Sequence, residues 1–154
     1  FRHLLVSLDQ RLKATTSRVI ATRAGKSAIA PDLATMSPIV FQGGADEASL
    51  SVIQSGEAWV HRSDPKPLTI ARLGQGDFFG NLPFLHLRQE PEFAGVYADE
   101  ALETESVDVK PLIDAYNGMS LTFKNIVDNV AACVSVTSGL LSELSEQQRS
   151  FTTE

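Results

Sequence analysis

Residues 73–85 read Leu-Gly-Gln-Gly-Asp-Phe-Phe-Gly-Asn-Leu-Pro-Phe-Leu. The glycines at 74 and 76 favour a tight turn and the aromatic pair at 78–79 begins an apolar run, so the stretch predicts two strands joined by a turn. The same pattern extends outward, with short apolar runs and turn signals alternating about every ten residues, which is typical of an antiparallel sandwich or barrel. The predicted strands are Ile39–Phe41, Leu50–Ile53, Ala58–Val60, Leu68–Ile70, Phe78–Phe79, Val96–Ala98 and Val107–Val109.

Helical spacing flanks this β region on both sides. Near the N-terminus, apolar residues and Thr15 alternate at steps of three and four, the spacing of a coiled-coil seam. Pro111 to Tyr116 predicts a short helix, and Ser120 to about Gln148 predicts a long one. We expect Cys133, in the middle of the long helix, to be a packed thiol. The long helix has a seam of its own: Phe123, Val127, Val130, Val134, Thr137, Leu141 and Leu144.

A single offset of 122 residues aligns the two flanking helices. It places Phe1 over Phe123, Leu8 over Val130, and Thr15-Thr16 over Thr137-Ser138. Any two amphipathic helices can be aligned by their aliphatic residues, but that does not explain the shared hydroxyl pair. We therefore favour a true repeat. The chain then divides into 1–22 as the closing helix of an upstream copy (or simply an N-terminal helix), 23–35 as a linker, 36–119 as the β domain, 120–148 as a pairing helix and 149–154 as a frayed tail.

The composition excludes several classes of protein. The chain has 154 residues with 13 basic and 19 acidic side chains, and its net charge of −6 repels phosphate backbones, so we expect no nucleic-acid binding. One cysteine excludes an internal disulfide. No apolar run approaches the ~20 residues that span a bilayer, and no secretory leader opens the chain. We expect a cytoplasmic protein without membrane association, and the start at Phe1 indicates a piece of a longer one.

Three segments, residues 54–60, 73–85 and 94–98, together resemble the cyclic nucleotide-binding domain family. This family provides the sensor domains of catabolite-activator-type bacterial regulators, kinase regulatory subunits and gated channels. The resemblance covers roughly Ser37 to Ser145. It implies a mainly β protein with flanking α: an antiparallel β jelly roll (double-stranded β-helix) preceded by an N-terminal helix and followed by a long dimerisation helix. It also implies that Thr137 and Ser138 face the base of a nucleotide, whereas the alternative for Thr15 and Thr137 is a hydrogen bond to a carbonyl of their own helix.

The family binds a cyclic phosphate with a cassette that reads Phe-Gly-Glu-aliphatic-small-aliphatic, followed later by Arg-x-Ala. The resemblance maps this cassette onto Phe79, Gly80, Asn81, Leu82 and Pro83, and then onto Glu92, Phe93 and Ala94. Asn81 replaces the glutamate that holds the ribose, Pro83 has no amide to donate, and Glu92 replaces the arginine that pairs with the phosphate.

Glu92 decides the expected affinity. A carboxylate ~4 Å from a phosphate adds about 4 kcal/mol of repulsion at an effective dielectric near 20. After screening, we expect affinity to fall by about a thousandfold or more. Arg88 is a candidate compensating cation, although Glu90 and Glu92 are placed to pair with it.

Two functions remain open, and neither is enzymatic. The histidines at 3, 61 and 86 are scattered, and no catalytic triad can be assembled, so we predict no catalytic residue, no metal and no cofactor beyond a possible cyclic nucleotide. One hypothesis is a regulatory signal-transduction sensor with weak, altered or lost ligand affinity. The other is a structural pairing module, as a homodimer or an intrachain pseudo-dimer. Either uses the seam Leu5, Leu8, Leu12, Val127, Val130, Val134 and Leu141.

Overall fold

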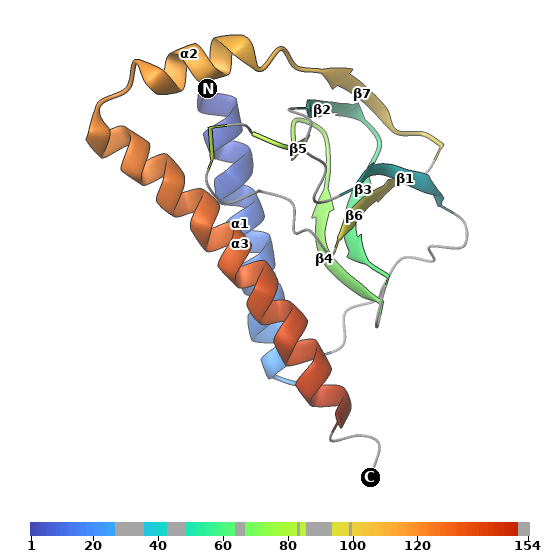
Figure 1. The fold of residues 1–154 in the computed structure, drawn as a ribbon. Coiled ribbons are helices and arrows are strands. Elements are labelled where there is room, and N and C mark those ends of the chain that lie inside the picture. Colours follow the sequence, from blue (N-terminus) through green and yellow to red (C-terminus); the bar gives the residue numbers. More distant parts are fainter. Residues whose placement is uncertain are drawn as a thin grey trace.

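The computed structural model describes residues 1–26, 36–42, 49–63, 67–82, 84–85, 94–98 and 100–150. Figure 1 shows a β region flanked along one side by two long helices, with a short helix across their N-terminal ends. The helices are α1 (Arg2–Arg23), α2 (Lys110–Asn117) and α3 (Leu121–Ser150). The strands are β1 (Ser37–Gln42), β2 (Leu50–Ser55), β3 (Ala58–Arg62), β4 (Leu68–Leu73), β5 (Phe78–Gly80), β6 (Gly95–Ala98) and β7 (Glu103–Ser106).

The strands form two antiparallel sheets, which we call the barrel. One sheet has the order β1-β6-β3-β4 and the other the order β5-β2-β7. The turn between β4 and β5 is held by Asp77, whose carboxylate accepts a hydrogen bond from the Gly74 amide at 2.8 Å and whose carbonyl accepts one from Ile53 at 2.9 Å. Gly76 has φ +84°, a conformation that favours glycine. The turn predicted from residues 73–78 therefore forms, and it links the two sheets.

The last predicted strand was misplaced. An apolar run predicted a strand over Val107–Val109, but β7 covers Glu103–Ser106, which pairs with β2. All four β7 residues are exposed, so the strand has no apolar alternation to detect. Val107 and Val109 instead follow the strand and pack against a second apolar cluster beside the helices.

Helix α3 extends slightly beyond its prediction. It includes residues 149–150, which we had assigned to a frayed tail, and Arg23 of the predicted linker belongs to α1. Residues 27–35 of the linker and 151–154 of the tail lie outside the described residues. Figure 1 shows that α1 and α3 run side by side in the same direction.

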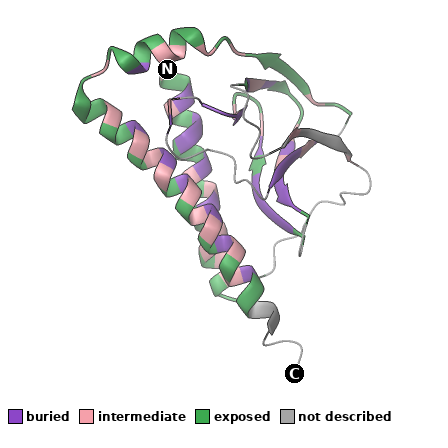
Figure 2. Cartoon of the chain, viewed as in Figure 1, coloured by how far each residue is buried: buried purple, intermediate pink, exposed green. Residues whose placement is uncertain are grey.

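Two apolar clusters hold these layers together, and Figure 2 shows buried residues on both long helices and on the strands. The first cluster fills the barrel and includes Val60, Ile70, Phe79 and Val96, with Leu141 from α3. The second joins both long helices to the start of β2 and to the segment after β5: Leu4, Leu8, Leu50, Leu82, Leu85, Tyr116, Val127 and Ala131. In the described part of the chain, no helix has the length and apolar character needed to cross a membrane.

Candidate functional site

The first half of the predicted cassette lies at the end of β5, where the backbone approaches β2 very closely. Gly80 pairs with Leu50 and has φ +122°. A Cβ at this position would lie 2.1 Å from the Ser49 carbonyl oxygen, so only glycine fits. The next amide, of Asn81, donates to the same carbonyl at 2.7 Å. The Asn81 amide is therefore already hydrogen-bonded to the backbone of the protein.

The predicted ligand-binding side chains here are enclosed. Asn81 is only 7% exposed, and Phe79, Leu82 and Ala94 are also buried. Leu82 packs in the helix-side cluster with Leu4 and Leu8 of α1. The remaining cassette residues predicted from sequence, Pro83, Glu92 and Phe93, lie outside the described residues, as does Arg88.

Helix α3 closes one side of the barrel. Leu141 is completely buried and belongs to the same cluster as Phe79 of the cassette strand. Val19 of α1 and Phe41 of β1 pack against this cluster, and the Phe41 and Phe79 ring centroids are 6.4 Å apart. Side chains from both sheets and from α3 thus pack together beside the cassette strand.

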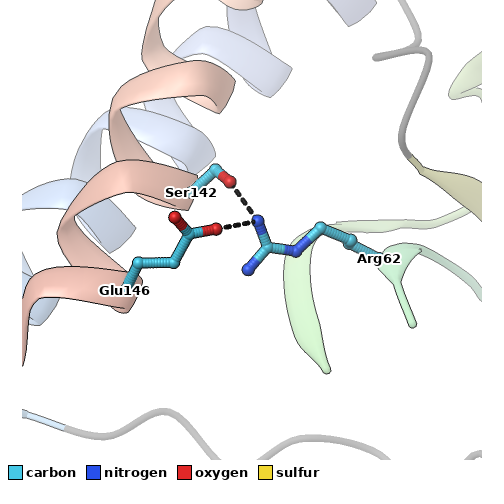
Figure 3. A network of polar contacts seen from close by, with 3 residues as sticks. All are labelled: Arg62, Ser142 and Glu146. Atoms are coloured by element: carbon cyan, nitrogen blue, oxygen red, sulfur yellow. Dashed lines mark hydrogen bonds and ion pairs between the residues drawn. The ribbon is translucent and has the colours of Figure 1, made fainter. Parts of the chain in front are cut away.

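A buried arginine connects the barrel to α3, and sequence reasoning missed it. Arg62, at the end of β3, is 3% exposed. Figure 3 shows its guanidinium reaching α3, where Nη1 donates to Ser142 Oγ and to Glu146 Oε1, the latter at 2.8 Å. The partners lie 80 and 84 residues away in the sequence, so no local pattern signals the contact.

The predicted base-facing hydroxyls lie between the helices. Thr15 is fully buried, and its Oγ1 lies 3.1 Å from Thr137 Oγ1. Each threonine also contacts the carbonyl four residues earlier, at 3.0 Å for Thr15 to Arg11 and 2.7 Å for Thr137 to Cys133. Ser138 is buried and donates to the Val134 carbonyl at 2.8 Å. These hydroxyls therefore have partners within the helix pair.

The predicted seam between the helices is buried or half-buried. Two predictions on α3, those for Phe123 and Cys133, were wrong. Leu8, Val127, Val134 and Leu141 are buried, and Leu5, Leu12 and Val130 are half-buried. Phe123, placed on the seam by its spacing, is 62% exposed. Phe1, which the 122-residue offset aligns with Phe123, lies against Phe84, with ring centroids 5.9 Å apart.

The second correction concerns Cys133. It is exposed rather than packed, because it lies beside the seam and not in it. Helical pitch turns its side chain away from Val134, which is the buried seam residue next to it.

His61 is a buried titratable group in β3. Its Nδ1 lies 3.1 Å from Thr69 Oγ1, and no residue that the structure describes forms a hydrogen bond with Nε2. Burial lowers the pKa of His61, and the positive charge of Arg62 lowers it further. Among the described residues, no group of three or more His, Cys, Asp or Glu side chains is placed to hold a metal ion.

A cavity of about 360 Å³ lies between the start of α1, β2, β7 and α2. Its lining is mostly apolar and includes Phe1, Leu4, Val52, Phe78 and Val107. None of the described ligand-binding residues predicted from sequence lines this cavity.

Comparison with known proteins gives matches at the level of fold. No protein-family model matches the sequence, and no curated protein matches it. The structure of the EAL enzyme Bd1971 bound to cAMP and cyclic-di-GMP is similar, with TM-score 0.55 and 16% identity over 74% of this chain and 31% of that chain. The cGMP-bound form has TM-score 0.51 and 18% identity over 61% of this chain and 25% of that chain.

The chain thus spans less than a third of each of these two Bd1971 chains. A looser likeness, with TM-score 0.41 and 16% identity, is to a cyclic nucleotide-binding domain from Methylobacillus flagellatus, over 75% of this chain and 62% of that one. Two antiparallel sheets, the flanking helices and the likeness to Bd1971 agree with what residues 54–98 implied, and the described part of this chain has the fold of a cyclic nucleotide-binding domain.

Proposed function

We propose that the chain is a non-enzymatic regulatory sensor domain of the cyclic nucleotide-binding type, with weak, altered or lost ligand affinity. The observation that carries this proposal is the burial of Leu141 from α3 in the same cluster as Phe79 of the cassette strand. Because one cluster includes both, a change beside the cassette alters the packing of α3. In this proposal the two sheets form a cytoplasmic jelly roll and α3 transmits the signal.

The ligand class is argued from the shared fold and from charge. The Bd1971 structures are described as bound to cAMP, cGMP and cyclic-di-GMP, which makes cyclic nucleotides the ligands to test here. A cyclic phosphodiester carries a negative charge whose burial needs a cation or several donors. The described cassette residues, Phe79 to Leu82 and Ala94, carry no positive charge, and the sequence places Glu92 at the arginine position. We therefore expect weak binding.

The proposed output is a change in the population of docked α3. In the docked state, Leu141 is buried and Arg62 contacts Ser142 and Glu146. A ligand shifts this equilibrium only if it binds the docked and undocked states with different affinities. A ligand that enters beside Phe79 meets this condition, because it contacts the cluster that α3 completes.

Titration calorimetry with cAMP and with cGMP tests the proposal. We expect no micromolar binding to the unaltered chain. The double variant Asn81→Glu with Glu92→Arg restores the ribose acceptor and the phosphate cation, so it should bind at least about a hundredfold more tightly. Glu92→Gln is the matched control, because it removes the repulsion without adding a cation, and it should fall between the two. Micromolar binding by the unaltered chain would contradict the predicted loss of affinity.

The contact between α1 and α3 favours a second candidate, a structural pairing module without a ligand. Both helices contribute to one apolar cluster, and the hydroxyls of Thr15 and Thr137 are in contact. In this second candidate function, the fold serves to hold the helix pair and binds no ligand. Continued absence of binding by the double variant, with unchanged helix content and stability, would favour the pairing module over the sensor.

A further inference from the structure

The exposed apolar side chains of this protein are concentrated on its two long helices. Within the described residues, every large apolar side chain that is exposed belongs to α1 or α3. They are Val6, Ile20, Leu121, Phe123, Ile126, Val136 and Leu140. Such a concentration on one pair of elements is typical of a surface that another part of a protein covers.

The two helices have the arrangement expected of an approximate twofold pair. They run in the same direction, and Thr15 contacts Thr137, its counterpart 122 residues later. Val19 and its counterpart Leu141 pack at the barrel cluster. Each α1 residue therefore has a counterpart on α3.

One face of α1 is covered by the barrel. Ser7 Oγ donates to Asp77 Oδ1 at 3.1 Å and accepts from the Phe78 amide at 3.2 Å. Leu4 and Arg11, on the same face, are also buried. Ala14 and Arg18 continue this face and are half-buried.

The counterparts of these five residues on α3 are all exposed. Ile126, Val136 and Leu140 are 49%, 57% and 44% exposed, and Asn129 and Cys133 are exposed as well. Helical spacing places all five along one side of α3. The side of α3 that corresponds to the barrel-facing side of α1 is thus apolar but uncovered among the described residues.

Two further pairs of counterparts also differ, with one residue in contact and the other exposed. Ser142 of α3 contacts Arg62 of the barrel, whereas its counterpart Ile20 on α1 is 64% exposed. Phe1 lies against Phe84, whereas its counterpart Phe123 is exposed. In both pairs, one helix residue contacts a strand or the segment after β5, and its counterpart on the other helix is exposed.

We propose that a second β-barrel of the same fold, carried ahead of α1 on the same polypeptide, docks on the outer helix face. This face consists of Phe123, Ile126, Cys133, Val136 and Leu140 of α3 with Val6 and Ile20 of α1. The occupant follows from the symmetry, because the operation that carries α1 onto α3 also carries this barrel onto the outer helix face. Helix α1 is then the closing helix of the second barrel, as α3 is of this one. The proposal rests on helix register and exposure, and it does not require ligand binding.

The reactivity of the cysteine at position 133 tests this docking. Its labelling rate with a maleimide is measured by peptide mass spectrometry in the 154-residue chain and in the full natural polypeptide that carries it. We expect fast labelling in the chain and labelling at least about tenfold slower in the full polypeptide. The register also places a counterpart of the Gly74–Phe78 turn roughly 45 residues before Phe1.

A pair of variants separates docking from general instability. In the full polypeptide, Leu140→Glu should restore fast labelling, because it places a charge in the apolar contact. Asn125→Glu is the matched control, since Asn125 is exposed on α3 outside the outer helix face, and it should leave labelling slow. Equal labelling of Cys133 in chain and full polypeptide, absence of a barrel before Phe1, or protection of Cys133 in the 154-residue chain by self-association would overturn the proposal.

Discussion

The hydroxyl oxygens of Thr15 and Thr137 lie 3.1 Å apart, and the two residues are separated by the 122 positions that align the flanking helices. A hydroxyl pair at equal positions of two parallel helices is expected of a repeat, and it fixes the register of α1 on α3.

The effects of replacing these two threonines on the free energy of unfolding should not add. Replacing one should cost more than half of what replacing both costs. Thr15→Val keeps the β-branched shape and removes one buried hydroxyl, so we expect a loss of about 1 kcal/mol in the free energy of unfolding. Thr15→Val with Thr137→Val should show a coupling of about 0.5 kcal/mol in urea denaturation. The exposed neighbour Thr16→Val is the control and should change little. Strict additivity would contradict a direct contact.

The glycines around the cassette should differ sharply when each is replaced by alanine. Gly80→Ala combines positive φ with a Cβ 2.1 Å from the Ser49 carbonyl oxygen, so it should destabilise by at least about 3 kcal/mol. Gly76→Ala meets no atom within 4 Å but retains φ +84°, and should cost about 1 kcal/mol. Gly74→Ala meets nothing within 4 Å and serves as the control. Thermal unfolding measures all three, and equal effects would disprove the close approach of β5 to β2.

Removing the charge of Glu146 should loosen the last turns of α3. Arg62 is buried while Glu146 is about half exposed, so solvent screening reduces the contribution of the pair and we expect Glu146→Gln to cost about 1 kcal/mol. Hydrogen exchange should increase over the C-terminal half of α3, with little change in β2. Glu143→Gln, an exposed carboxylate on the same helix, should leave exchange unchanged. Similar exchange in both variants would show that the Arg62 contact does not hold the helix.

Stability should fall in acid because of His61. Its folded pKa lies below the ordinary 6.5, so the unfolded state binds the proton more readily. The contribution is complete above pH 6.5 and is lost as the pH falls through the folded pKa. His61→Gln lacks the titrating ring, so its unfolding free energy should change less between about pH 7.5 and about pH 5. An identical pH dependence of the two proteins would show that His61 remains solvated.

Spacing and turn chemistry could predict the strands and helices because their apolar residues alternate with the period of the element. This signal failed at β7, where the exposed residues Glu103–Ser106 form a strand through backbone pairing alone. The seam of α1 and α3 was also predictable, since both helices carry the same 3–4 spacing. The exposure of Phe123 was not, because its spacing is that of the seam although its side chain is exposed.

The candidate site was less predictable than the fold. Local motifs identified Gly80 and Asn81, but the enclosure of Asn81 depends on packing from other elements. Arg62 could not be found from sequence, because its partners lie on a helix far along the chain and follow no motif. Long-range polar contacts of this kind are set by tertiary packing.

The bridge from Arg62 to α3 sets an upper limit on how much of the C-terminus can be deleted. Ending the chain after Leu141 would keep this buried leucine in the barrel cluster but remove both Ser142 and Glu146. The guanidinium would then stay inside the protein without these two acceptors, which is costly for a charged group. We therefore expect the minimal folding unit to reach at least to Glu146, five residues beyond Leu141 of the apolar core.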